Sequence, residues 1–137
     1  MNAQTGFSLG ALEQRLALMQ ELAGELEQAQ AAIVASDSNE FQLHTDRQRT
    51  LCEAVCALSS PPAPAEVSPD FQQRREILTQ KLAKIENRVR QLNRIHAALV
   101  RRAQRTLAIF SRALASSALT YVAPQAQTSS TELCSER

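Results

Sequence analysis

The stretch Ser59–Pro69 (SSPPAPAEVSP) decides the fold, because prolines cluster there between two long tracts that hold almost no helix breakers. Three prolines within four positions exclude an α-helix and favour an extended chain. Outside this stretch the chain has one further proline, and its three glycines all lie in the first 24 residues. Each tract can therefore form about 50 residues of helix. The sequence predicts an all-α fold, a long antiparallel helical hairpin with coiled-coil-like packing and a Pro-rich turn at 60–69.

The tract before the prolines has the apolar period of a helix. Ser8 is placed to cap it, and the apolar positions that follow at alternating spacings of three and four are Leu9, Leu12, Leu16, Met19, Ala23 and Leu26. The same spacing resumes after residues 36–39, so we expect one helix over 8–58, kinked or frayed at 36–39. The alternative is a three-helix bundle, because Asp37 followed by Glu40 is the pattern of a capping box at the start of a new helix.

The tract after the prolines is predicted to form a helix over 70–120, capped by Asp70. Its first apolar series is Phe71, Leu78, Leu82, Ile85, Val89 and Leu92, continuing through His96 to Leu99, Ala103 and Phe110. A second series, spaced by seven, is Val100, Leu107, Leu114 and Tyr121. One series suffices for packing against the first helix. The other is left either for the core or for a second protein.

Length and charge indicate one domain, expected over 1–124 with a disordered tail at 125–137. Residues 1–60 carry eight acidic and three basic side chains, and residues 61–122 carry four acidic and eleven basic ones. Complementary charge favours pairing between the two halves. A nucleic-acid surface on the basic half is the less favoured interpretation, because stacking aromatics are not interleaved with its arginines.

An odd number of cysteines and no signal peptide predict a cytoplasmic location, and no segment is apolar enough to predict a membrane span.

No residue pattern indicates catalysis, a metal or a cofactor. His44 and His96 lie within the helical stripes, where a histidine is expected to be a polar core or edge residue. Cys52 and Cys56, four residues apart, could present two thiolates to a metal, but further ligands at a recognised spacing are missing from the sequence. We expect both cysteines to be small buried packing residues.

Several segments together resemble the FlgN family of flagellar export chaperones. They are Asp37, Leu43–Leu51 (LHTDRQRTL), Gln91–Leu99 (QLNRIHAAL), Arg105–Phe110 (RTLAIF) and Thr120–Pro124 (TYVAP). Family members pair a long first helix with a second long helix that leads into an amphipathic end. The resemblance covers most of residues 9–124.

The resemblance implies a cytoplasmic type III export chaperone that holds hook–filament junction (hook-associated) proteins before their secretion. The client would bind the amphipathic end of the second helix, where the apolar stripes supply Leu99, Val100, Ala103, Leu107, Ile109, Phe110 and Leu114. Tyr121 would dock on the flagellar export gate. The competing hypotheses are a structural coiled-coil adaptor with a permanent partner and, less favoured, a nucleic-acid-binding helical protein. The oligomeric state is left open.

Overall fold

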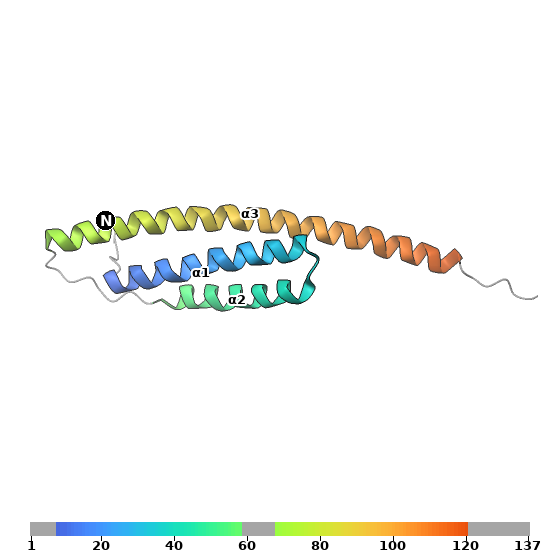
Figure 1. Cartoon of the computed structure of the whole chain (residues 1–137), viewed down its shortest axis with the longest axis horizontal. Helices are drawn as coiled ribbons and strands as arrows, with labels where there is room; N and C mark the ends of the chain where they lie inside the picture. The colour runs from blue at the N-terminus through green and yellow to red at the C-terminus, as the bar shows by residue number, and fades with distance from the viewer. Residues whose placement is uncertain (1–7, 59–67, 121–137) are drawn as a thin grey trace, which may run out of the picture. The chain divides into compact units, whose positions relative to one another are not determined.

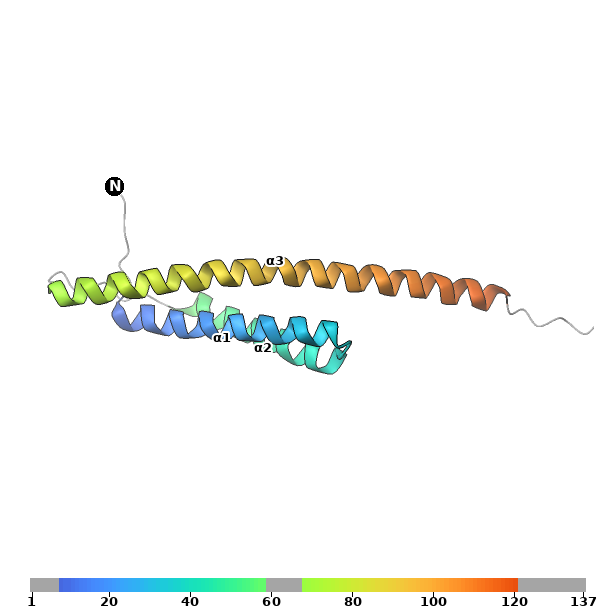
Figure 2. The same ribbon diagram turned by 45° about the horizontal axis from the view of Figure 1, so that its top comes forward.

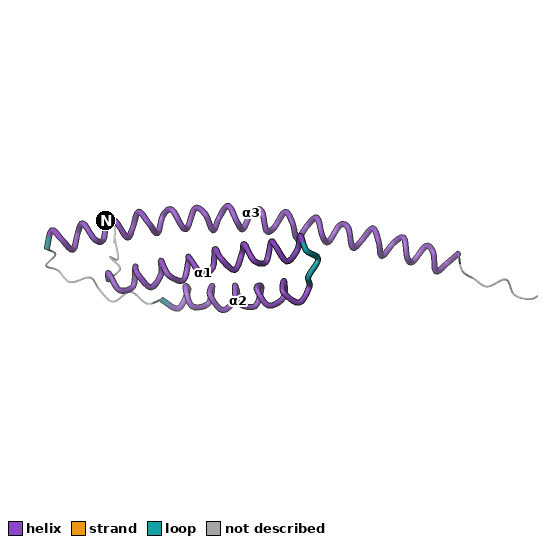
Figure 3. The backbone as a smooth tube through the Cα atoms, in the orientation of Figure 1, coloured by secondary structure: helices purple, strands orange, loops and turns teal. Residues whose placement is uncertain are grey.

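The computed structural model describes residues 8–58 and 68–120, and in these ranges the chain forms three helices and no strand. They are α1 (Leu9–Val34), α2 (Ser38–Ala57) and α3 (Pro69–Thr120), drawn along the chain in Figure 1 and coloured as helix in Figure 3. The predicted all-α fold is confirmed. The chain divides into two units, Met1–Ala103 and Gln104–Arg137, with α3 running from the first into the second.

The first tract is two helices rather than one, so the expectation of a single helix over 8–58 was wrong and the three-helix alternative was right. The reason is a local stop. Ser36 adopts a left-handed conformation with φ of 57°, its N–H donates to Ile33 O, and the Asp37 N–H donates to Ala32 O at 2.9 Å. These two bonds form a Schellman motif, which satisfies the last carbonyls of α1.

Asp37 starts α2 by capping it. Its carboxylate accepts hydrogen bonds from the backbone N–H groups of Asn39 at 3.1 Å and Glu40 at 3.0 Å. The cap was predicted from the sequence, but the reciprocal half of the capping box is absent, since the Glu40 carboxylate lies 3.3 Å from His44 Nε2. A helix stop followed at once by a helix cap turns the chain back on itself (Figure 3).

The start of α3 also differs from the prediction. Ser68 precedes the helix, its hydroxyl accepts from the Phe71 N–H at 3.4 Å, and its carbonyl accepts from Gln72 N. Pro69 therefore occupies the first helical position, where its missing N–H costs nothing and its fixed φ suits the helix. Asp70, the predicted cap, lies in the first turn instead, where a negative charge still interacts favourably with the helix dipole. The predicted Pro-rich turn at 60–69 falls almost wholly outside the described residues.

In the first unit, α1 and α3 run in the same direction and α2 runs against both (Figures 1 and 2). The antiparallel pair is thus α1 with α2, rather than the first and second halves of the chain. The core combines one stripe of α1, Leu12, Met19, Leu22, Ala23 and Leu26, with Leu82, Val89 and Leu92 of α3. Leu51 and Val55 of α2 pack against its edge.

The stripes of α1 and α3 have identical spacing. In α1 the sequence is Leu12, Leu16, Met19, Ala23, Leu26, and in α3 it is Leu78, Leu82, Ile85, Val89, Leu92. Each α3 residue stands the same number of positions after its α1 counterpart, so two helices running in the same direction can bring the stripes together all along their length. None of the described helices is long and apolar enough to cross a membrane.

Candidate protein-interaction surface

The C-terminal part of α3 exposes large apolar side chains. Leu107 is 66% exposed, Phe110 62% and Leu114 70%. They continue the 3–4 spacing of the residues that α3 buries in the first unit, where Leu82, Val89 and Leu92 are at most 9% exposed. An exposed apolar cluster on a well-formed helix is typical of a surface that binds another protein. We call residues 99–118 of α3 the apolar segment.

Of the predicted client-binding residues, three lie at the end of the first unit and four in the second. Leu99, Val100 and Ala103 are partly buried. Leu107, Ile109, Phe110 and Leu114 are exposed, with Ile109 at 66%. Phe110 of the first apolar series is thus exposed, as Leu107 of the second series is. Tyr121 lies outside the described residues.

The charged side chains of the apolar segment are all basic. Residues 99–118 hold Arg101, Arg102, Arg105 and Arg112 and no aspartate or glutamate. Arg105 comes two residues before Leu107, and Arg112 two residues before Leu114. Residues two apart on a helix point to nearly opposite sides, so these arginines lie across the helix from the apolar face. The segment is a cationic amphipathic helix.

Arginines of α3 also pair with acidic residues of α1. Arg74 Nη2 lies 3.9 Å from Glu13 Oε1, and Arg88 forms an ion pair with Glu27. A third pair has the opposite sense, with Arg15 Nη2 3.2 Å from Glu86 Oε1. The pairs at Glu13 and Glu27 are largely exposed, so their contribution to stability is small. They show, however, which kind of helix the apolar face of α3 accepts in the first unit: one with Leu and Ala in the stripe and carboxylates beside it.

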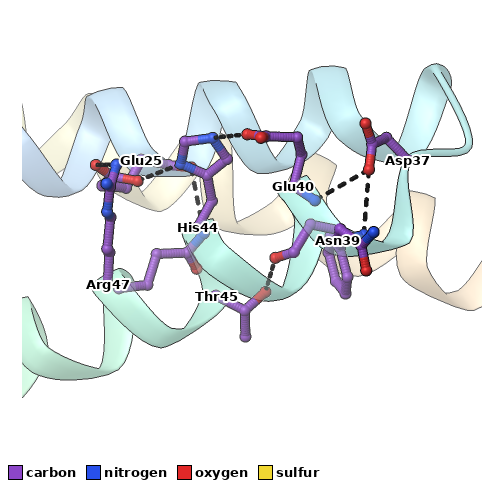
Figure 4. Close-up of polar contacts among 9 residues, drawn as sticks. Glu25, Asp37, Asn39, Glu40, His44, Thr45 and Arg47 are labelled. Carbon is purple, nitrogen blue, oxygen red and sulfur yellow. Dashed lines mark hydrogen bonds and ion pairs between the residues drawn. The ribbon is translucent and has the colours of Figure 1, made fainter.

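A polar cluster joins α2 to α1 around the buried His44 (Figure 4). His44 Nδ1 lies 2.5 Å from Glu25 Oε2, and its Nε2 faces Glu40. Arg47 Nη1 lies 3.6 Å from the other Glu25 oxygen. A carboxylate at each ring nitrogen and an arginine behind one of them satisfy a histidine that would otherwise be buried without partners. His44 was predicted as a polar core or edge residue, and the structure buries it.

His96 has a different environment, on the face of α3 that meets α2. The Phe41 ring stacks on it with centroids 5.9 Å apart and an angle of 18° between the planes. His96 Nδ1 is buried and has no hydrogen-bond partner among the described residues. Burial lowers the pKa of His96 below its ordinary value of 6.5, because the charged ring would lose its hydration. The sequence predicted His96 as a polar core or edge residue but carried no signal for the Phe41 stack.

Cys52 and Cys56 are exposed free thiols, so the prediction that they are buried packing residues was wrong. Each follows a packed residue, Leu51 or Val55, by one position. One position is about 100° around a helix, which turns both thiols away from the interface. Among the described residues no three acidic, histidine or cysteine side chains gather as a metal site would need.

A groove that is wide open to solvent lies between α1 and α2 in the first unit. Glu21, Glu25 and Asp46 line it together with Leu43, Arg47, Thr50 and Leu51. Its carboxylates are spread along the two helices, and Glu25 is already engaged by His44 and Arg47.

Comparison of the chain with known protein families, with characterised proteins and with solved structures gives no match.

Proposed function

We propose that the protein is a cytoplasmic, non-enzymatic export chaperone of the flagellar type III system, which binds hook-associated proteins before secretion. The observation that carries the proposal is the exposure of Leu107, Phe110 and Leu114 on an otherwise regular helix. Water-exposed apolar side chains at helical spacing suit helix-in-groove or helix-on-helix recognition. The resemblance of the sequence to flagellar export chaperones supplies the class of client.

The apolar side chains of this face can supply a large part of the free energy of a specific complex. Burying a Leu or Phe side chain contributes roughly 1.5–3 kcal/mol before ordering costs. Three such anchors supply roughly 4.5–9 kcal/mol before those costs, and micromolar binding corresponds to about 8 kcal/mol, so a tight complex also needs contacts beyond these three side chains. Tyr121 keeps its proposed role in docking on the export gate, which rests on the resemblance.

The direct test is calorimetry of the full chain with a purified hook-associated protein. We expect a one-to-one complex that the double variant Leu107→Ser/Leu114→Ser weakens at least about tenfold, because two anchors lose their apolar contacts. Ile77→Ser is a matched control, since Ile77 is exposed on α3 but lies far along the sequence from the apolar segment. Equal affinity of wild type and double variant would remove the apolar segment as the client site.

The same exposed side chains also fit a structural coiled-coil adaptor with a permanent partner. The two functions differ in whether the bound partner is released. A chaperone gives up its client when the export machinery takes it, so the complex should exchange with excess unlabelled client. A complex that does not exchange, and a protein found only with one partner in cells, would favour the adaptor.

A further inference from the structure

The charge of the apolar segment specifies the chemistry of its partner. Residues 99–118 are a stretch of four arginines without a single carboxylate. In the first unit the apolar face of α3 is covered by α1, whose segment 9–34 holds four glutamates and one arginine. Two of those glutamates pair with α3 arginines fourteen residues apart, Glu13 with Arg74 and Glu27 with Arg88. The packing of α1 on α3 therefore shows, within the same chain, which kind of helix binds the apolar face of α3.

We propose that the apolar segment binds an acidic amphipathic helix of the partner protein, about 20 residues or ~30 Å long, with Leu and Ala at 3–4 spacing and carboxylates at its edges. This inference rests on the proposed function and names the segment of the client that is held. Arg102 comes fourteen residues after Arg88 and so occupies the corresponding position along α3, beside the apolar stripe. A carboxylate at the edge of the partner helix would lie next to it.

The charge also argues against a second copy of the segment as the occupant. A second copy of the segment would bring four arginines against four, and like charges at an interface disfavour association. An acidic helix keeps the apolar contact and gains from the positive field of the whole segment, which also speeds encounter.

Three designed peptides of 21 residues test the inference. They share one Leu/Ala stripe and differ at the remaining positions, which are mainly Glu in the first peptide, Gln in the second and Lys in the third. Fluorescence anisotropy with the full chain should give binding at least tenfold tighter for the Glu peptide than for the Gln peptide, and none for the Lys peptide. The advantage of the Glu peptide should shrink as salt is raised, because screening weakens attraction between exposed charges.

Reversing the charge of single arginines shows which side of the helix the charges of the peptide meet. Arg102→Glu should weaken the Glu peptide and strengthen a peptide with Lys at one edge, whereas Arg112→Glu, across the helix, should change both much less. Circular dichroism of each variant checks that helix content is unchanged. Equal affinities for the Glu, Gln and Lys peptides would overturn the inference. So would self-association in sedimentation, or binding of vesicles rich in phosphatidylglycerol with an affinity matching the Glu peptide.

Failure of this inference can be told from failure of the proposed function. If all three peptides bind equally and all are lost in Leu107→Ser/Leu114→Ser, the acidic requirement falls while the docking face stands. If that double variant holds its hook-associated protein as tightly as the wild type does, the proposed function falls at this face and the inference falls with it.

Discussion

His44 of α2 and Glu25 of α1 are joined by a contact of 2.5 Å between Nδ1 and Oε2, in a region where both side chains have little access to water. The pair connects two helices whose apolar contact is limited, since α2 packs only the edge of the core. Its loss would leave one buried polar group without its partner. Such a group costs more than the net gain of an ordinary hydrogen bond.

We expect His44→Ala to lower the free energy of unfolding by about 1–3 kcal/mol, because Glu25 would be left with desolvated oxygens and α2 would lose packing against α1. Urea denaturation followed by circular dichroism measures the change. Glu53→Gln, an exposed position on the same helix, serves as the control and should stay within about 0.5 kcal/mol of wild type. A His44→Ala protein as stable as the control would show that the cluster is incidental.

Ser36→Gly should stabilise the protein. Ser36 has φ of 57°, a conformation in which a side chain is strained and glycine is not. The gain should be up to about 1 kcal/mol, reduced by the greater freedom of glycine in the unfolded chain. Thermal unfolding of this variant and of Ser36→Val, which should be destabilised, gives a pair of opposite signs. If both variants shift in the same direction, the strain at this turn is not what limits stability.

The pH dependence of stability should contain a contribution from His96. Its pKa is lowered in the folded state, so the unfolded chain takes up a proton near the ordinary value of 6.5 while the folded protein does not. The unfolded state then binds more protons, and stability falls as the pH drops below about 6.5. Melting temperatures of the wild type and His96→Gln at pH 7.5 and 5.5 should show a smaller loss in the variant. Identical losses would exclude His96 as a source.

The exposed thiols make a chemical prediction. Cys52 and Cys56 should react with a thiol reagent in the folded protein as fast as in denaturant, because neither is shielded. Replacing both by Ser should change stability by less than about 0.5 kcal/mol. Mass spectrometry after brief labelling counts the modified cysteines. Protection of either thiol until urea is added would mean that another surface covers α2.

Truncation after Arg105 should leave the three-helix unit folded and abolish client binding. The buried core residues all come before residue 93, so their packing does not require the removed part. The urea midpoint should change little, whereas calorimetry with a hook-associated protein should show no heat of binding. Retained binding by the truncated chain would place the client site on the first unit, for example at the groove between α1 and α2.

Much of the fold follows from the sequence, and the exceptions have physical reasons. The apolar period located the two helical tracts on either side of the prolines, and the Ser8 cap is confirmed by its bond from the Ala11 N–H. The sequence favoured one helix across Ser36 because the 3–4 apolar spacing resumes after it. A period reports which side of a helix is buried and is silent on whether the chain turns between two such helices. The turn depends on a single left-handed residue.

The candidate site was predicted in part, since its apolar stripes are visible in the sequence but their exposure is not. A stripe looks the same whether another helix covers it, as at Val89, or whether it stays in water, as at Leu107. The thiols were expected to be buried and are exposed. Cys52 and Cys56 each follow a packed residue by one position, and a side chain at such a position is buried only where a neighbouring helix covers it.

The ion pairs of α1 and α3 remove an ambiguity that the apolar stripes leave open. Stripes that repeat every seven residues fit equally well after one helix slides along the other by seven. The charges do not. If α1 slid forward by seven, Glu13 would meet Lys81, but Glu27 would face the apolar Ile95 and Arg15 would face the neutral Asn93 in place of Glu86. Weak exposed pairs, which add little stability, thus select one alignment out of several that the core alone cannot tell apart.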